Sequence, residues 1–291
     1  MTERDMRLTL EADFILHPGR RPLSLFTRVV TPAAPEAGLI FYHGSMVHSE
    51  YYMPWALELA QAAPITIWLP DLRGHGRSGG ARGHVPAIRD YLFDIALTVA
   101  EFRRRWPELP LFLGGESFGG LLVFLAVTEI PSVQGLILSA PVFGLKADLS
   151  RGLQRIIQSA DRILPFVRPL RPLGAEGIVR HPQWPRLIKS DPLVIRKYPL
   201  HFLAELLRAQ RQAENVAPLV SVPLLMLIAG QDHIVDNQAA ERICQQVRGP
   251  VWWKKFPDSW HALSSESPDL YQDTMVQFIN TYYACDMVNP A

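Results

Sequence analysis

One serine of the chain lies in the pentapeptide GESFG at residues 115–119. A short apolar segment at residues 111–113 precedes it, and an apolar helical pattern at residues 118–127 follows it. A serine on a tight turn between a strand and a helix exposes its hydroxyl for attack, and the glycines on either side leave room for the strained backbone. The pattern predicts that Ser117 is the nucleophile of a hydrolytic reaction.

A serine hydroxyl is a weak nucleophile, so a base and an acid that orients the base must accompany it. Asp232 follows the apolar segment at residues 224–228, and His261 follows the one at residues 251–256. Their order after the serine, acid and then histidine, is the order that accompanies this kind of serine turn. We expect His261 to take the proton of Ser117 and Asp232 to hold the imidazole tautomer.

Two other aspartates are alternative acids. Asp236 lies four residues after Asp232, at the expected start of a helix, where a carboxylate caps free N–H groups well. Asp258 is closer to His261 in the sequence but shares its loop, whereas the acid is expected after the preceding strand. The sequence therefore favours Asp232.

Negative charge that develops on the substrate oxygen needs main-chain N–H donors aimed at it. The residue after the nucleophile, Phe118, is expected to supply one of them. The second is expected from the loop after the apolar segment at residues 39–42, where His43, Gly44 and Ser45 follow. We expect the Ser45 amide to be this donor and His43 and Gly44 to contact the substrate.

The elements that must position these residues alternate along the chain. Continuous apolar runs, typical of strands that are covered on both faces of a parallel sheet, occur at residues 38–42, 65–69, 111–113, 133–138, 223–228 and 251–256. Helical patterns occur at residues 88–106, 118–130, 237–248 and 268–284. Extended segments near residues 7–16 and 23–30 indicate an antiparallel opening hairpin. This order predicts an α/β fold with a mostly parallel sheet flanked by helices.

The alternation stops after Pro141 and resumes only at the segment 223–228. Apolar residues recur at helical spacing in between, and prolines divide the stretch into short elements. Because a structureless loop of this length is uncommon in a compact domain, the sequence predicts an inserted helical cap at residues 142–216. The core domain is then made of residues 1–141 and 217–291. An acyl chain is expected between cap and core, in contact with Glu116 of the core and with Ile157 and Leu164 of the cap.

The composition limits the class of protein. The 291 residues are 48% hydrophobic and 20% charged, which supports a packed core and excludes a mainly disordered chain. The longest apolar runs are shorter than the ~20 residues that cross a bilayer, and residues 1–11 show no secretory pattern. The two cysteines, Cys244 and Cys285, are not at a metal or redox spacing. We expect a cytoplasmic protein with unpaired thiols and no bound metal.

Charge is distributed unevenly along the chain. The net charge is +1, which gives no reason to expect a nucleic acid partner. Residues 146–200, however, hold 11 Lys and Arg and 4 Asp and Glu, so the remainder of the chain carries a balance of −6. The basic segment suggests a peripheral contact of the cap with an anionic membrane surface, and ordinary solvation of arginines is the alternative.

Several motifs together resemble the α/β-hydrolases of the monoacylglycerol lipase and lysophospholipase group. The resemblance covers roughly residues 22–284. The motifs are FYHG at 41–44 with His48, Ser49 and Tyr52, DLRGHGRS at 71–78, GESFGG at 115–120, LSAP at 138–141 and SDPL at 190–193.

This resemblance implies an α/β-hydrolase fold with an eight-stranded, mostly parallel sheet and an inserted cap. It carries the catalytic roles onto Ser117, Asp232 and His261, and the oxyanion amides onto Ser45 and Phe118. It also implies that no cofactor is needed and that the substrate is a carboxylic ester with an apolar acyl chain, of the monoacylglycerol or lysophospholipid type, cleaved through an acyl-enzyme.

Other functions stay open at this point. A short-chain carboxylesterase would use the same residues. An aminopeptidase would need acids in the cap to hold a free amine, and the cap is basic. A binding protein of the same fold is a third alternative, although such proteins usually lack a member of the catalytic set. The GxGxxG match at residues 74–79 lacks the following helix start and acid of a dinucleotide site, and Asp71 and Arg73 are expected to brace neighbouring loops instead.

Overall fold

Eight strands form one sheet in the computed structural model, which describes residues 8–17, 23–146, 150–168 and 177–283. Their order across the sheet is β1-β2-β4-β3-β5-β6-β7-β8. The strands are β1 Thr9–His17, β2 Leu23–Thr31, β3 Ala37–Tyr42, β4 Ile65–Pro70, β5 Leu111–Glu116, β6 Val133–Ser139, β7 Leu224–Ala229 and β8 Val251–Phe256. The pairs β1–β2 and β2–β4 are antiparallel and all other neighbours are parallel. The predicted opening hairpin and mostly parallel sheet are thus confirmed.

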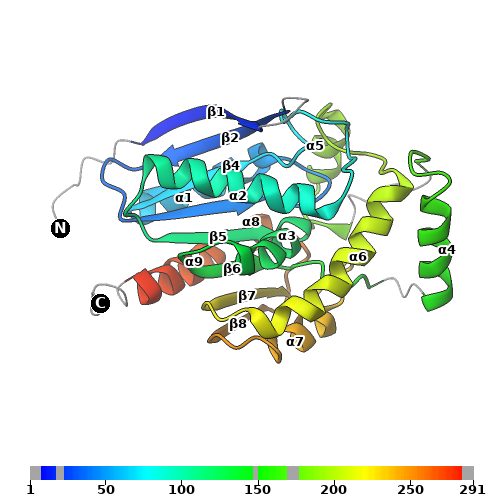
Figure 1. Cartoon of the computed structure of the whole chain (residues 1–291). Coiled ribbons are helices and arrows are strands. Elements are labelled where there is room, and N and C mark those ends of the chain that lie inside the picture. Colours follow the sequence, from blue (N-terminus) through cyan, green and yellow to red (C-terminus); the bar gives the residue numbers. More distant parts are fainter. Residues whose placement is uncertain (1–7, 18–22, 147–149, 169–176, 284–291) are drawn as a thin grey trace.

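Helices cover both faces of this sheet (Figure 1). They are α1 Met53–Ala62, α2 Ile88–Arg105, α3 Phe118–Ala126, α4 Arg151–Asp161, α5 Trp184–Ser190, α6 Leu200–Val216, α7 Asn237–Cys244, α8 Leu263–Glu266 and α9 Pro268–Tyr283. One apolar core contains residues of α2, α3, α6 and α7, and the other contains residues of α1 and α9. Because side chains of a strand alternate between faces, neighbours such as Leu39 and Ile40 enter different cores.

Helices α1 and α5 were not expected from the sequence, and neither was the short helix α8. Helix α1 has a proline in its first turn and buries Trp55, Ala56, Leu59 and Ala60 against the sheet. These apolar positions have helical spacing, so the sequence does carry a signal for this helix. The short helix α5 also contains an early proline and buries Ile188 alone among its residues, which leaves little periodicity to detect.

The segment between β6 and β7 carries α4, α5 and α6. Helices α4 and α5 and the start of α6 lie at the side of the sheet opposite to the two chain ends in Figure 1. Ile157 of α4 packs against Ala204 and Leu207 of α6 in a small cluster. Tyr198 and Phe202 belong instead to a core that continues into the sheet. The segment therefore packs on the core domain, while the predicted cap limits at residues 142 and 216 stay a prediction.

The described residues can also be compared with the expectations for membrane spans and cysteines. None of their helices combines the length and the apolar character that a membrane crossing requires. Cys244 is a free, partly buried thiol, and Cys285 lies outside the described ranges.

Helix α3 approaches the sheet so closely that only glycine fits at the contact. A Cβ atom on Gly119 would lie 2.3 Å from the carbonyl oxygen of Tyr42, and one on Gly115 would lie 2.5 Å from the carbonyl carbon of Gly119. These neighbours are main-chain atoms, which do not move aside as a flexible side chain would. The turn between β5 and α3 is thus held directly against the end of β3.

We expect Gly119→Ala to lower the free energy of unfolding by about 1–3 kcal/mol, because overpacking at this contact must displace the backbone. Gly152→Ala in α4 is the matched control, since a Cβ atom there would meet only the Ser150 hydroxyl at 3.9 Å. The control should be neutral or stabilising by up to ~1 kcal/mol, as alanine favours a helix. Urea unfolding measures the free energy of unfolding of both variants. Equal values for Gly119→Ala and Gly152→Ala would contradict the close contact at Gly119.

Candidate active site

Ser117 lies at the junction of β5 and α3 in a strained conformation. Its backbone has φ 54° and ψ −112°, a region that non-glycine residues rarely adopt. The Ser117 N–H donates to the carbonyl of Ser139 at 2.8 Å, and its own carbonyl accepts from the N–H groups of Leu121 and Val142, each at 3.1 Å. Strain of this kind persists only where the surroundings fix it. The side chain is thereby presented to a cavity above the sheet.

Asp232 and His261 lie next to each other because they follow the paired parallel strands β7 and β8. The His261 Nδ1 lies 2.8 Å from the Asp232 Oδ2, and the Asp232 Oδ1 accepts from the N–H groups of Ile234 and Val235 at 2.8 and 3.0 Å. A carboxylate accepts here, so Nδ1 carries the proton and Nε2 is left to take one. His261 and Ser117 line the same cavity.

The electrostatics of this pair favour an ionised acid and a basic imidazole. Burial alone would raise the pKa of Asp232, but the attraction and hydrogen bond of His261 and the two main-chain bonds hold it below its ordinary value. Burial alone would lower the pKa of His261, but the Asp232 carboxylate and its hydrogen bond raise it above its ordinary value. The carboxylate therefore stabilises the imidazolium that proton transfer would create.

The two alternative aspartates are placed differently. Asp236 is the N-cap of α7, and its Oδ1 accepts from the Gln238 N–H at 3.0 Å. Its Oδ2 lies 3.4 Å from an Arg242 nitrogen. Asp258 is exposed on the loop before His261. The structure thus brings Asp232, and neither of these, into contact with the imidazole.

The loop after β3 holds its polar main-chain groups in fixed directions. The His43 Nε2 accepts from the Leu72 N–H at 2.9 Å, so Nδ1 carries the proton and donates to the Gly44 carbonyl at 2.7 Å. Burial lowers the pKa of His43 to about 4, which keeps this tautomer neutral near pH 7. The Gly44 N–H donates to the Tyr52 hydroxyl at 3.2 Å, and the Tyr198 hydroxyl donates to the Ser45 carbonyl.

These bonds leave the Ser45 N–H without a hydrogen-bond partner among the residues that the structure describes. A trans peptide directs its N–H away from its carbonyl, and His43 holds the carbonyl of the Gly44–Ser45 peptide. The Phe118 N–H opens α3 and belongs to the first turn, whose N–H groups have no partner within the helix. Ser45 and Phe118 both line the cavity. Their two amides are therefore candidate donors to a substrate oxyanion.

The cavity beside Ser117 has a volume of about 260 Å³, close to the ~300 Å³ at which small-molecule sites begin. Among the residues predicted from the sequence, Gly44, Ser45, Glu116, Ser117, Phe118 and His261 line it. Most of its other lining residues are apolar or aromatic: Met46, Val47, Tyr51, Tyr52, Val142, Leu145, Ile178, Trp184, Tyr198, Phe202, Leu203, Leu206, Ile234 and Ala262. Two serines, Ser264 and Ser265, complete the lining.

Three residues predicted to contact the substrate do not line this cavity. His43 is buried behind the cavity because both ring nitrogens bind main-chain groups. Ile157 faces the α4–α6 cluster and not the cavity. Leu164 is 52% exposed at the surface. The apolar spacing that marked Ile157 and Leu164 indicates a helix, but it does not tell which of its faces meets the cavity.

Most of the missed lining residues come from segments distant in the sequence. Tyr51 and Tyr52 lie in the 3-10 helix η1, Ser49–Tyr52. Tyr198 lies just before α6, and Phe202 lies in the first turn of α6. Phe202 and Leu206 are four residues apart, so helical spacing could have identified this face of α6. The two tyrosines of η1 offered no periodic signal.

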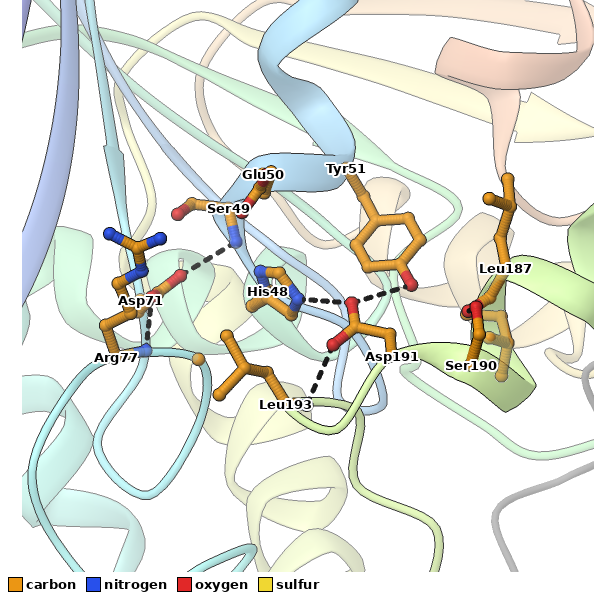
Figure 2. A network of polar contacts seen from close by, with 12 residues as sticks. His48, Ser49, Glu50, Tyr51, Asp71, Arg77, Leu187, Ser190, Asp191 and Leu193 are labelled. Atoms are coloured by element: carbon orange, nitrogen blue, oxygen red, sulfur yellow. Dashed lines mark hydrogen bonds and ion pairs between the residues drawn. The ribbon is translucent and has the colours of Figure 1, made fainter.

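A polar network joins the loop after β3 to the segment before α6 (Figure 2). The Asp191 Oδ2 lies 2.8 Å from the His48 Nε2 and accepts from the Tyr51 hydroxyl at 3.0 Å. Burial opposes ionisation of Asp191, but these bonds and the Leu193 N–H hold its pKa below the ordinary value. This cluster brings the sequence motifs around His48 and Asp191 into direct contact.

Asp71, also drawn in Figure 2, connects two neighbouring segments through its carboxylate. Its two oxygens accept from the N–H groups of Ser49 and Arg77 at 2.8 and 2.7 Å. Arg73 binds Asp94 of α2 through two hydrogen bonds of 2.5 and 2.6 Å. The expectation that Asp71 braces neighbouring loops is confirmed, whereas Arg73 is bound to helix α2 and not to a loop.

Comparison with known proteins relates the chain to lipid-cleaving and peptide-cleaving hydrolases. The family described as "Serine aminopeptidase, S33" matches residues 33–268. The phospholipase YtpA of Bacillus subtilis (strain 168) is 29% identical over 207 residues, which cover 70% of this chain and 78% of that protein. The monoglyceride lipase of Mus musculus is 28% identical over 253 residues, which cover 84% of this chain and 82% of the lipase.

A solved structure has the same architecture. The monoacylglycerol lipase of Paleococcus ferrophilus superposes with a TM-score of 0.77 at 20% identity, over 88% of this chain and 98% of that one. At this identity the likeness concerns the fold alone. It confirms the prediction of an α/β-hydrolase fold.

We expect Asp232→Asn to lower kcat by ~10³–10⁴-fold, because the amide no longer stabilises the imidazolium or fixes its tautomer. Asp236→Asn is the matched control and should retain most of the activity, since asparagine caps a helix about as well as aspartate. Steady-state hydrolysis of a p-nitrophenyl ester measures both variants. Loss of activity in Asp236→Asn with retention in Asp232→Asn would identify the other aspartate as the acid.

Proposed function

The chain belongs to the family described as "Serine aminopeptidase, S33", and we propose that it hydrolyses carboxylic esters that carry an apolar acyl chain. The proposal rests chiefly on the mostly apolar cavity that Ser117 and His261 help to line. The names of its relatives, a phospholipase and a monoglyceride lipase, support the same chemistry.

The reaction proceeds through an acyl-enzyme. The Ser117 Oγ attacks the ester carbonyl carbon while its proton passes to the His261 Nε2. The N–H groups of Ser45 and Phe118 bind the oxyanion that forms. The tetrahedral intermediate then expels the alcohol, which takes the proton from His261. Water, deprotonated by the same imidazole, attacks the acyl carbon and releases the carboxylic acid and Ser117.

The lining of the cavity favours a substrate with a single acyl chain. Its apolar side chains exclude water from a hydrocarbon chain, and its volume of about 260 Å³ is small for a ligand with several chains. A monoacylglycerol or a lysophospholipid combines one such chain with a polar head that extends towards the opening. We assign the substrate to this class.

Aminopeptidase activity, which the family description suggests, is the second candidate. A free α-amine needs an accessible carboxylate near the nucleophile, and Glu116 is the one acid among the described lining residues. Its side chain is buried and hydrogen-bonded to Tyr52, and burial raises the pKa of Glu116 to about 7. A carboxyl group in this state is a poor partner for an ammonium group, so ester hydrolysis is favoured.

A series of monoacylglycerols and p-nitrophenyl esters of increasing chain length tests the proposal. We expect kcat/KM to rise at least ~10-fold from acetyl to medium-chain esters, which corresponds to only about two buried CH₂ groups. Ser117→Ala should abolish turnover. Leu206→Trp, which fills the cavity, should reduce activity on medium-chain esters more than on acetyl esters, whereas Leu219→Trp at an exposed position should not. A preference for aminoacyl arylamides or for acetyl esters would contradict the proposal.

The exposed surface of the segment after β6 suits contact with an anionic lipid surface. Ile156, Ile163 and Phe166 are 65, 78 and 73% exposed. Arg155 and Arg162 are exposed beside them. Large apolar side chains interspersed with arginines are typical of segments that lie at a membrane interface. This surface would bring the cavity to substrates held in a bilayer.

Sedimentation with vesicles tests this contact. Phosphatidylserine in phosphatidylcholine vesicles should increase binding, and the double substitution Arg155→Ala, Arg162→Ala should reduce it ~10-fold or more, because each basic residue contributes about 1 kcal/mol. The matched control is the double substitution Arg248→Ala, Lys255→Ala at exposed positions of the core domain. Vesicle binding that changes neither with salt concentration nor with the Arg155→Ala, Arg162→Ala substitution would contradict the proposed membrane contact.

A further inference from the structure

The proposed mechanism gives no role to the one acid among the described residues that line the cavity. Glu116 immediately precedes Ser117, is 4% exposed and lines the cavity. Its Oε1 accepts a hydrogen bond of 2.7 Å from the Tyr52 hydroxyl. The same hydroxyl accepts from the Gly44 N–H at 3.2 Å. A continuous chain of hydrogen bonds thus joins the residue before the nucleophile to the loop that carries the Ser45 amide.

Glu116 determines the donor-to-acceptor direction of these hydrogen bonds. A tyrosine hydroxyl has one proton, and here the proton is donated to Glu116, so the oxygen lone pairs face Gly44. Without an acceptor at Glu116 the hydroxyl would be free to turn, and the buried Gly44 N–H could lose its partner. An unpaired buried N–H is costly, so the loop would be expected to shift.

The surroundings of Glu116 keep it in this role. Burial raises its pKa to about 7, and His261, Asp232, Ser139 and Tyr271 are the other polar groups that face it. The Oε2 is buried and has no hydrogen-bond partner among the described residues. Because Oε2 has no donor among these residues, the ionised carboxylate is poorly stabilised. Oε1 can nevertheless accept the Tyr52 hydrogen bond whether Glu116 is ionised or protonated on Oε2.

We propose that Glu116 and Tyr52 are positioning residues that hold the Gly44–Ser45 peptide at a fixed separation from Ser117, and this rests on the proposed ester hydrolysis. Glu116 is covalently joined to the nucleophile, and Tyr52 binds the residue before the oxyanion donor. His43 and Tyr198 hold the carbonyls of Gly44 and Ser45 from other sides. The pair therefore sets the distance between the attacking oxygen and the Ser45 N–H, which must match the tetrahedral intermediate and not the bound ester.

Tyr52→Phe is the first test, because the ring is kept against Phe41 while the hydroxyl is removed. We expect kcat for a medium-chain p-nitrophenyl ester to fall ~10–100-fold, somewhat less than for loss of an oxyanion donor itself, with KM within ~3-fold of wild type. The affinity for a trifluoromethyl ketone, which adds to Ser117 and forms an oxyanion, should fall by the same factor as kcat/KM. A non-reacting alcohol analogue should bind as before.

Substitutions of Glu116 separate positioning from packing. Glu116→Gln retains a side-chain oxygen for Tyr52 and should keep kcat within ~3-fold of wild type. Glu116→Leu removes the acceptor and should behave as Tyr52→Phe does. Tyr271→Phe is the matched control, since its buried hydroxyl faces Glu116 but makes no bond to Gly44, and its kcat should equal that of wild type.

The outcomes distinguish this inference from the proposed function. If the wild type hydrolyses esters and Tyr52→Phe retains its kcat and its ketone affinity, the positioning role is wrong and the proposed function stands. Equal activity of Glu116→Gln and Glu116→Leu would also overturn it. If thermal unfolding shows that Tyr52→Phe does not fold, the comparison of Glu116→Gln with Glu116→Leu tests the positioning role by itself. A wild type that hydrolyses no ester would refute the proposed function first.

Discussion

The close approach of α3 to the ends of β3 and β5 is the constraint on which the rest of the site depends. Gly115 and Gly119 allow main chain to pack on main chain, with clearances that exclude a Cβ atom. The turn between them then holds Ser117 at a positive φ, fixed by hydrogen bonds from and to Ser139, Leu121 and Val142. The same contact brings the loop after β3 beside the serine, so that the nucleophile and the candidate oxyanion donors share one edge of the sheet.

The packing places the side chains of the site, and electrostatic interactions set the protonation states of its two histidines. The parallel pair β7–β8 delivers Asp232 and His261 side by side, and the buried carboxylate raises the affinity of the imidazole for a proton. The buried His43 stays neutral and acts through a fixed tautomer. Two histidines of one site thus have opposite pKa shifts, because His261 bonds directly to a carboxylate whereas burial dominates at His43.

Much of this arrangement could be predicted from the sequence, because it depends on local patterns. Continuous apolar runs identified the parallel strands, and residues at strand ends indicated Ser117, Asp232 and His261 as neighbours. The contacts of Ile157 and Leu164 could not be predicted, since helical spacing identifies an apolar face without telling what it packs against. The roles of Tyr52 and Tyr198 depend on segments far apart in the chain, and the single buried residue of α5 left no periodic pattern.

Reaction with an alkyl fluorophosphonate, followed by peptide mass spectrometry, tests whether Ser117 is the nucleophile of an ester hydrolase. We expect one adduct per chain, on Ser117, with hydrolysis of esters lost in proportion to the labelled fraction. An adduct on another residue, or full activity in completely labelled protein, would contradict it.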